Sequence, residues 1–298
     1  MHQIVVILFL VLILICMLFH VPIVITGAHT GLELWYESVL PSILPFMIIT
    51  SLLLQKVRGK GICYLGLFCG LPVGANLVNQ QYVSGQLNTN TANALLCICN
   101  ITSPMFISGY ILNQTLQQQV SAIRFFLIIY LPLIFYGLWC LLKSNRNLFQ
   151  HKPGHFRDFK PLSATQSVTE LNESSHITMS FEDIIKHSLQ VILMVGIYIM
   201  LFCILIQFLL SILPSDSVLP KLLTASFEIT NGIHLLMKLP IDIHQKTALI
   251  AGLTSFGGIC SVLQTKSVLT DKGLSIFHYV IVKLGMGVIS YLLALIWL

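Results

Sequence analysis

Residues 187–213 read HSLQVILMVGIYIMLFCILIQFLLSIL, a run that contains no Asp, Glu, Lys or Arg. A helix needs roughly 20 predominantly apolar residues to cross the hydrocarbon core of a bilayer, and this run is long enough to do so. The same absence of charge recurs in other stretches of the chain, at residues 4–27, 38–55, 61–77, 91–112 and 247–265. The pattern predicts an all-α polytopic membrane protein.

The composition argues against a soluble domain. Hydrophobic residues make up 56% of the 298 positions and charged residues only 9%, and the mean hydropathy is +0.87. A soluble domain carries roughly 25% charged residues, because its surface must stay hydrated. The net charge of +5 is concentrated in loops, where it sets the topology, so a nucleic-acid partner is not expected.

Nothing in the sequence indicates an enzyme. The eight cysteines lie in apolar segments without CxxC spacing, so neither a zinc site nor structural disulfides are expected. The sequence contains no HExxH pair, Walker loop or GxSxG motif. We therefore expect no catalytic residue, no metal site and no cofactor, apart from a coupling H+ or Na+.

Positive charges predict which loops are cytoplasmic. The polar segment 143–185 begins with a basic stretch, and a second basic cluster spans residues 56–60, whereas Glu33 and Glu37 lie in a stretch without Lys or Arg. Cytoplasmic loops are enriched in Lys and Arg. We therefore expect an N-terminal transmembrane helix within residues 1–30, an external loop at the two glutamates, and a cytoplasmic polar linker at residues 143–185.

Two segments are too irregular to span the membrane as straight helices. Residues 61–77 contain Pro72 in a glycine-rich sequence, and residues 221–239 are short and polar. Proline and glycine disfavour a continuous helix, and broken backbone at membrane depth is tolerated only where protein or a cavity surrounds it. We expect re-entrant hairpins that open to the cytoplasm and to the outside respectively. This path places the basic segments at residues 56–60, 143–160 and 266–272 inside.

The two halves of the chain then contain the same elements in opposite orientation: one helix, one hairpin, one broken helix and one helix. Residues 31–142 form the first predicted repeat and residues 186–298 the second, behind one extra N-terminal helix. An offset of 158 positions (232 minus 74) pairs Gly74 with Gly232. Many secondary transporters are built from such inverted-topology repeats, with the substrate at the repeat interface.

Four polar patches interrupt the apolar segments and suggest a binding site. The N-terminus of a half-helix presents N–H groups that attract an anion, and freed carbonyl and side-chain oxygens can hold a cation. The alternative is that small and polar residues only let the helices pack closely. The candidate substrate-binding residues are Gly70, Pro72, Gly74, Asn76, Asn100, Thr102, Ser103, Thr230, Asn231, Gly257, Gly258, Ser261 and Gln264, together with Glu228 and Lys283.

Glu228 and Lys283 are the charged residues among these candidates. A carboxylate at membrane depth is costly and is a functional-site hypothesis by default, so we expect Glu228 to hold a coupling proton or cation. Lys283 lies nine positions after residue 274, too deep in an apolar helix for an ordinary surface base, and we expect it to attract an anionic substrate. The alternative for both residues is a structural ion pair.

A set of motifs is distributed over residues 38–298, namely Gly70-Leu-Pro72-Val-Gly74-Ala75, Cys99-Asn100, Ser103-Pro104-Met-Phe-Ile, Glu228-Ile-Thr230-Asn-Gly232 and Phe256-Gly257-Gly258-Ile-Cys-Ser261-Val-Leu-Gln264, with Lys283 downstream. In these motifs the sequence resembles the YlbJ family of sporulation integral membrane proteins, part of a wider group with nucleoside-recognition Gate domains. It departs from the family pattern at Leu71, where an aromatic residue is expected, and at Ser103, where glycine is expected.

The resemblance implies that the predicted repeats are Gate-like and that the protein is a transporter or facilitator of a small anionic metabolite. That metabolite would be the aromatic dicarboxylate dipicolinic acid, imported towards the forespore during sporulation. The implied location is a cell membrane, specifically the outer forespore membrane, with the lipid bilayer and the anion as partners and a homo-oligomer left open. A nucleoside-like solute, or a non-transporting sensor or scaffold of sporulation, remain alternatives.

Overall fold

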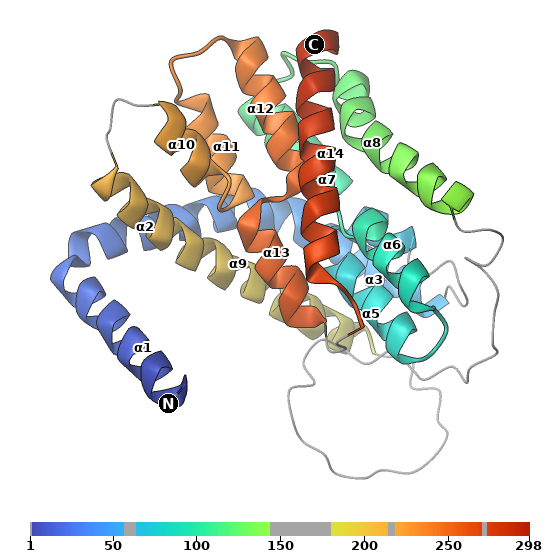
Figure 1. Ribbon diagram of the computed structural model, residues 1–298, viewed down its shortest axis with the longest axis horizontal. Helices are drawn as coiled ribbons and strands as arrows, with labels where there is room; N and C mark the ends of the chain where they lie inside the picture. The colour runs from blue at the N-terminus through green and yellow to red at the C-terminus, as the bar shows by residue number, and fades with distance from the viewer. Residues whose placement is uncertain (1, 57–63, 144–179, 214–217, 270–272) are drawn as a thin grey trace.

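The computed structural model describes residues 2–56, 64–143, 180–213, 218–269 and 273–298, and every regular element in these ranges is helical (Figure 1). Within them, six helical stretches are long and apolar enough to cross a membrane: Val21–Leu53, Thr89–Thr115, Ala122–Lys143, Phe181–Ile212, Ile243–Val268 and Ile276–Trp297. The predicted all-α polytopic membrane fold is confirmed. Most of the predicted linker, residues 144–179, lies outside the described residues.

The N-terminal part of the chain differs from the predicted boundaries. Helix α1 (His2–Phe19) is followed by α2 (Val21–Leu34), the π-helical segment η1 (Trp35–Val39) and α3 (Leu40–Lys56), which form one continuous helix. Glu33 and Glu37 therefore lie inside a helix, and the prediction of separate helices at 4–27 and 38–55 joined by an external loop is wrong. Pro22 lies in the first turn of α2, where its missing N–H leaves no helical bond unmade.

Packing against α9 (Phe181–Ile212) explains why the chain stays helical through residues 21–39. A Cβ atom added to Gly27 would come within 2.6 Å of the Cα of Ile204, so the two backbones are in direct contact, and Gly31 packs on α9 in the same way. Small residues permit this close approach of membrane helices. One turn later, Trp35 donates its Nε1–H to the carbonyl oxygen of Ile192 at 2.9 Å.

The remaining elements occur in the same order in both halves. The first half continues with α4 (Gly66–Cys69), α5 (Val73–Val83), α6 (Thr89–Cys99), α7 (Pro104–Phe106), η3 (Ile107–Thr115) and α8 (Ala122–Lys143). After α9, the second half continues with α10 (Val218–Ala225), α11 (Ile229–Met237), α12 (Ile243–Phe256), α13 (Gly258–Val268) and α14 (Ile276–Trp297). In Figure 1, α8 and α14 run in opposite directions. The inverted repeat itself stays a prediction.

Both segments predicted as hairpins consist of two short helices with a break between them. Helices α4 and α5 pack against each other around residues 70–72, and α10 and α11 pack against each other around residues 226–228. The second arm of the first pair extends to Val83, beyond the predicted end at residue 77. The membrane side to which each pair opens stays a prediction.

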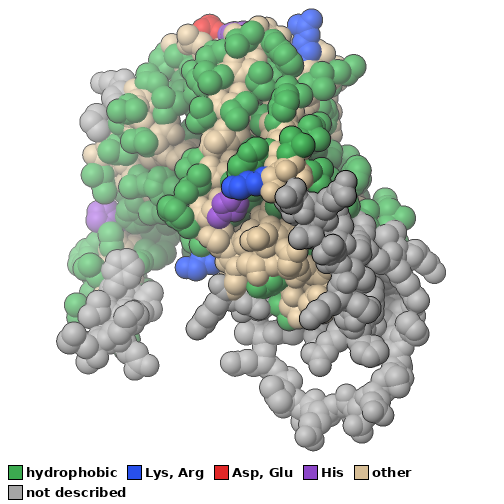
Figure 2. Space-filling view, turned by 45° about the vertical axis from the view of Figure 1, so that its right-hand side comes forward, with side chains coloured by type: hydrophobic (Ala, Val, Ile, Leu, Met, Phe, Trp, Pro, Cys, Tyr) green, Lys and Arg blue, Asp and Glu red, His purple; other side chains and the backbone are tan. Residues whose placement is uncertain are grey.

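Helices α8, α12 and α14 pack against one another and form a second packed region, apart from the contact between α2 and α9. The hydroxyl groups of Ser255 and Ser290 are 2.6 Å apart, and Ser290 also donates to the carbonyl oxygen of Ile128 in α8 at 3.0 Å. The outward faces of these helices carry exposed apolar side chains such as Leu138 and Ile296, and Figure 2 shows hydrophobic side chains over much of the upper part of this surface. Such a surface suits contact with lipid.

Candidate functional site

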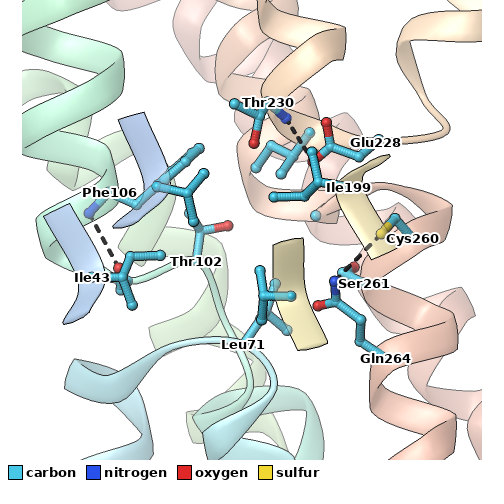
Figure 3. A pocket seen from close by; sticks show the side chains of 15 residues that line it. Ile43, Leu71, Thr102, Phe106, Ile199, Glu228, Thr230, Cys260, Ser261 and Gln264 are labelled. Carbon is cyan, nitrogen blue, oxygen red and sulfur yellow. Dashed lines mark hydrogen bonds between the residues drawn. The ribbon is translucent and has the colours of Figure 1, made fainter. Parts of the chain in front are cut away.

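Four helix interruptions meet at one cavity. They lie between α4 and α5, between α6 and α7, between α10 and α11, and between α12 and α13. Each contributes to the cavity lining, with Leu71, Ser103, Glu228 and Gly257 as examples (Figure 3). The cavity volume is about 60 Å³, several times the roughly 10–15 Å³ that one water molecule requires. The space therefore admits more than a single solvent molecule.

The lining combines polar and apolar side chains from segments that are far apart in the sequence. The polar residues come from the interruptions and from α13: Thr102, Ser103, Glu228, Thr230, Ser261 and Gln264, with the thiol of Cys260. The apolar residues come largely from η1, α3 and α9: Val39, Ile43, Leu71, Phe106, Val195, Ile199 and Ile229. In the view of Figure 3, Glu228, Cys260 and Gln264 approach from one side and Ile43, Thr102 and Phe106 from the other. The lining suits a solute with an apolar body and polar groups at its edge.

Glycine makes two of the interruptions possible. Gly70 has a φ of 76°, and a Cβ atom there would lie 2.7 Å from the Cβ of Ser103 across the cavity wall. Gly257 has a φ of 89° where α12 ends and α13 begins. Side chains other than glycine rarely adopt these positive φ values. Both residues therefore shape the backbone so that neighbouring interruptions can approach each other.

Glu228 caps the N-terminus of α11. Its Oε1 accepts the backbone N–H of Thr230 at 3.0 Å and its Oε2 accepts that of Asn231 at 2.7 Å, and the residue is only 2% exposed. Two N–H donors and the positive end of the helix dipole stabilise a carboxylate at this position. Among the described residues the one ion pair joins His29 and Glu33, so Glu228 is not paired with a base there.

At two other interruptions, N–H groups in the first turn of the following helix have acceptors within the protein. In α13, Ile259 and Cys260 donate to the carbonyl oxygens of Ser226 and Phe227 at 2.9 and 2.7 Å. Phe106 of α7 donates to Ser103 Oγ at 3.1 Å. These N–H groups are therefore occupied, and a solute in the cavity would be bound mainly by side chains. These N–H groups therefore do not support the prediction that the N-termini of half-helices bind an anion.

Several predicted site residues hold the interruptions together instead of lining the cavity. Asn100 is fully buried; its Oδ1 accepts the N–H of Ala75 at 3.2 Å, and its Nδ2 donates to Thr265 Oγ1 at 2.7 Å and to the hydroxyl of Tyr279 at 3.0 Å. This network joins the break in the first half to helices α13 and α14 of the second. A Cβ atom on Gly74 would collide with the carbonyl oxygen of Cys99.

The remaining predicted residues also lie outside the cavity lining. Asn231 donates its side-chain amide to the Cys203 thiol at 3.3 Å. Pro72 is the N-terminal cap residue of α5, Asn76 is half-buried in that helix, and Gly258 packs near the N–H of Ile229. Of the fifteen predicted site residues, those that line the cavity are Thr102, Ser103, Glu228, Thr230, Gly257, Ser261 and Gln264.

Lys283 lies in α14, apart from the cavity lining. The residue is only 1% exposed, and the titratable side chain with which it interacts electrostatically is Cys97 of α6. It forms no ion pair with any residue that the structure describes. The structure therefore brings Glu228 into the cavity without Lys283, and the alternative of a Glu228–Lys283 ion pair is wrong for this conformation.

Sequence reasoning missed the apolar half of the lining. Leu71 stands between two predicted residues and could have been included on that ground. Val39, Ile43, Val195 and Ile199 lie in long apolar helices, where nothing distinguishes a cavity-facing side chain from a lipid-facing one. Only the packing of α3 and α9 against the interruptions identifies them.

No protein-family model matches the chain, and no solved structure matches it. The chain is similar to the sporulation integral membrane protein YlbJ of Bacillus subtilis (strain 168), with 26% identity over an alignment of 304 positions that covers 88% of this chain and 74% of that protein. The aligned part includes most of the helices described above. The similarity confirms the resemblance to the YlbJ family of sporulation integral membrane proteins that the motifs indicated.

Proposed function

We propose that this membrane protein moves a small anionic metabolite across the bilayer, with dipicolinic acid as the first candidate. The observation that carries the proposal is the meeting of four helix interruptions at one cavity among membrane-spanning helices. Interrupted helices at membrane depth are found where a binding site or a pathway needs backbone that is free of regular helical bonds. The similarity to a sporulation protein supports the choice of solute.

The composition of the lining favours a flat solute with acidic groups at its rim. Ile43, Phe106 and Ile199 offer an apolar surface, and Thr102, Ser261 and Gln264 offer hydroxyl and amide groups. The Gln264 amide donates one N–H to the Cys260 thiol and keeps the other for a carboxylate. The Thr102 and Ser261 hydroxyls donate to the carbonyl oxygens of Thr254 and Gly258, so each could donate to a carboxylate only by giving up that bond. An aromatic dicarboxylate has this shape and distribution of polarity.

A nucleoside-like solute is the second candidate, because one feature of the lining favours it. The described residues that line the cavity include a carboxylate, Glu228, and none of them is Lys, Arg or His. An uncharged solute rich in hydrogen-bond donors would satisfy Glu228 directly. Leu71 and Ser103, which depart from the family pattern, both line this cavity, and this also fits a different solute.

Uptake into proteoliposomes tests the proposal. Purified protein in vesicles should accumulate labelled dipicolinate, while uridine and simple dicarboxylates show how selective the cavity is. Preferential uptake of uridine would transfer the assignment to the nucleoside-like solute. A protein that inserts correctly but moves none of the three solutes would support the sensor or scaffold alternative.

A matched pair of substitutions on α9 connects uptake to the cavity. Ile199 is 2% exposed and lines the cavity, whereas Ile197 is 42% exposed on the same helix. Ile199→Trp should fill the space and reduce uptake at least tenfold, and Ile197→Trp should leave uptake close to that of the unaltered protein. Leu71→Phe provides a smaller change in the same cavity if the tryptophan variant is poorly expressed. Equal uptake in all variants would refute the cavity as the route.

A further inference from the structure

Glu228 faces the cavity without a cationic partner. It is the acidic residue among the described cavity-lining side chains, and each of its oxygens already accepts one backbone N–H from α11. These two hydrogen bonds fix the carboxyl group, while Figure 3 shows the side chain directed towards the space occupied by the other lining residues. A solute in the cavity therefore meets this group at close range.

Among the residues that the structure describes, no group around Glu228 would neutralise it. The titratable side chains of the described residues that interact with it are Tyr110 from η3, Cys203 from α9 and Cys260 from α13. Each carries no charge in its protonated form, and none can become a cation. An ionised Glu228 would therefore repel an anionic solute in an environment that screens charge poorly.

The same surroundings favour a proton over a sodium ion. Hard cations select several oxygen ligands, whereas thiols suit softer metals. Two of the three titratable neighbours are thiols; Cys203 accepts a hydrogen bond from Asn231 at 3.3 Å and Cys260 one from Gln264 at 3.4 Å. A proton requires only one lone pair of the carboxylate and no ligand shell.

We propose that Glu228 takes up one proton whenever the anionic solute enters the cavity, so that solute and proton cross the membrane together; this rests on the proposed function. The carboxylate gains a proton from water on the side of entry and becomes a neutral carboxylic acid. Its O–H can then donate to a carboxylate of the solute, and the proton returns to water on the side of exit. Because binding is reciprocal, the solute strengthens proton binding as much as the proton strengthens solute binding.

Proteoliposomes that contain a pH-sensitive dye test this coupling. The membrane potential is clamped at zero with potassium and valinomycin, and labelled dipicolinate is added outside. Solute entry should acidify the interior, and an external pH one unit below the internal pH should drive accumulation to about tenfold, the value for one proton per solute. Replacing sodium by choline should change nothing.

Glu228→Gln separates proton coupling from solute binding. Glutamine is uncharged and keeps one oxygen to accept an N–H of α11, while its amide NH2 replaces the oxygen that accepted the second N–H. This variant should still exchange external for internal solute, but without acidification and without accumulation under a pH gradient. Glu182→Gln, an equivalent change at an exposed position in the first turn of α9, should behave like the unaltered protein.

The possible outcomes separate a failure of the proposed transport function from a failure of the proton coupling. An unaltered protein that moves no solute would refute the proposed function. An unaltered protein that accumulates solute without proton entry, or under a sodium gradient alone, would refute the coupling and leave transport intact. Both of these tests use the unaltered protein, so they can be carried out even if Glu228→Gln is not recovered in folded form.

Discussion

Glu228 and Lys283, the buried charged residues among those that the structure describes, occupy different environments. Glu228 is held by two backbone N–H donors at the cavity, whereas Lys283 lies in α14 away from the cavity lining, next to Cys97. Each is almost inaccessible to solvent. Glu228 and Lys283 therefore do not belong to one binding site, although burial of either charge costs free energy.

Replacing Lys283 tests whether it contributes to solute binding. Because it does not line the cavity, Lys283→Met should leave the KM for dipicolinate unchanged. Removal of a buried amine should also maintain or raise the thermal stability in detergent, since a central lysine costs about 2.5–3.5 kcal/mol on membrane-insertion scales. Lys283→Arg serves as the control that retains the charge. A severalfold increase in KM for the methionine variant but not for the arginine variant would show that Lys283 attracts the anion, as the sequence first indicated.

At the scale of elements, the interruptions depend on close backbone contact between neighbouring helices. Helix α5 approaches the end of α6 at Gly74, where no Cβ can be accommodated next to the carbonyl oxygen of Cys99. Glycine at such a contact is required by packing and not by chain flexibility. In contrast, an added Cβ on Gly285 of α14 would meet no atom within 4 Å.

A pair of glycine substitutions should therefore have opposite effects. Gly74→Ala should destabilise the protein by about 1–3 kcal/mol or more, because the added methyl group overpacks two backbones that cannot easily separate. Gly285→Ala should be neutral or stabilising by up to about 1 kcal/mol, since alanine is the better helix former. Thermal unfolding in detergent measures both variants. Equal stability of the two would contradict the contact between α5 and α6.

At the scale of the whole molecule, hydrogen bonds connect the two halves through the cavity region. Thr102 donates to the carbonyl oxygen of Thr254 at 2.8 Å, and the hydroxyl of Tyr110 donates to the carbonyl oxygen of Thr230 at 2.9 Å. Each bond joins a residue of the first half to one of the second. The cavity is thus a property of the assembled halves, as expected for a site at a repeat interface.

Accessibility labelling tests whether these halves have opposite orientations in the membrane. Asn90 and Gln245 are exposed residues in the first turns of α6 and α12. In a cysteine-free background, a membrane-impermeant thiol reagent should reach Asn90→Cys from the cytoplasmic side and Gln245→Cys from the outside. Labelling of both cysteines from the same side would refute the inverted repeat.

The sequence by itself determined that this is a helical membrane protein and located the helix interruptions, because hydrocarbon length, charge and proline or glycine act locally. It placed Pro72, Ser103, Glu228 and Gly257 at or beside breaks that the structure contains. The sequence predicted a loop at residues 28–37, but the chain is helical there. The helix continues because Gly31 and Trp35 pack on α9, which lies more than 150 residues away in the chain.

Only the tertiary structure decided which of the marked residues share a cavity. Asn100 and Thr102 stand two positions apart, yet one joins a buried network and the other lines the cavity. Lys283 and Glu228 both appeared as charged site residues, and packing separated them. The physical reason is that a polar residue in an apolar helix must find a partner, and the sequence does not show whether this partner is another helix or a solute.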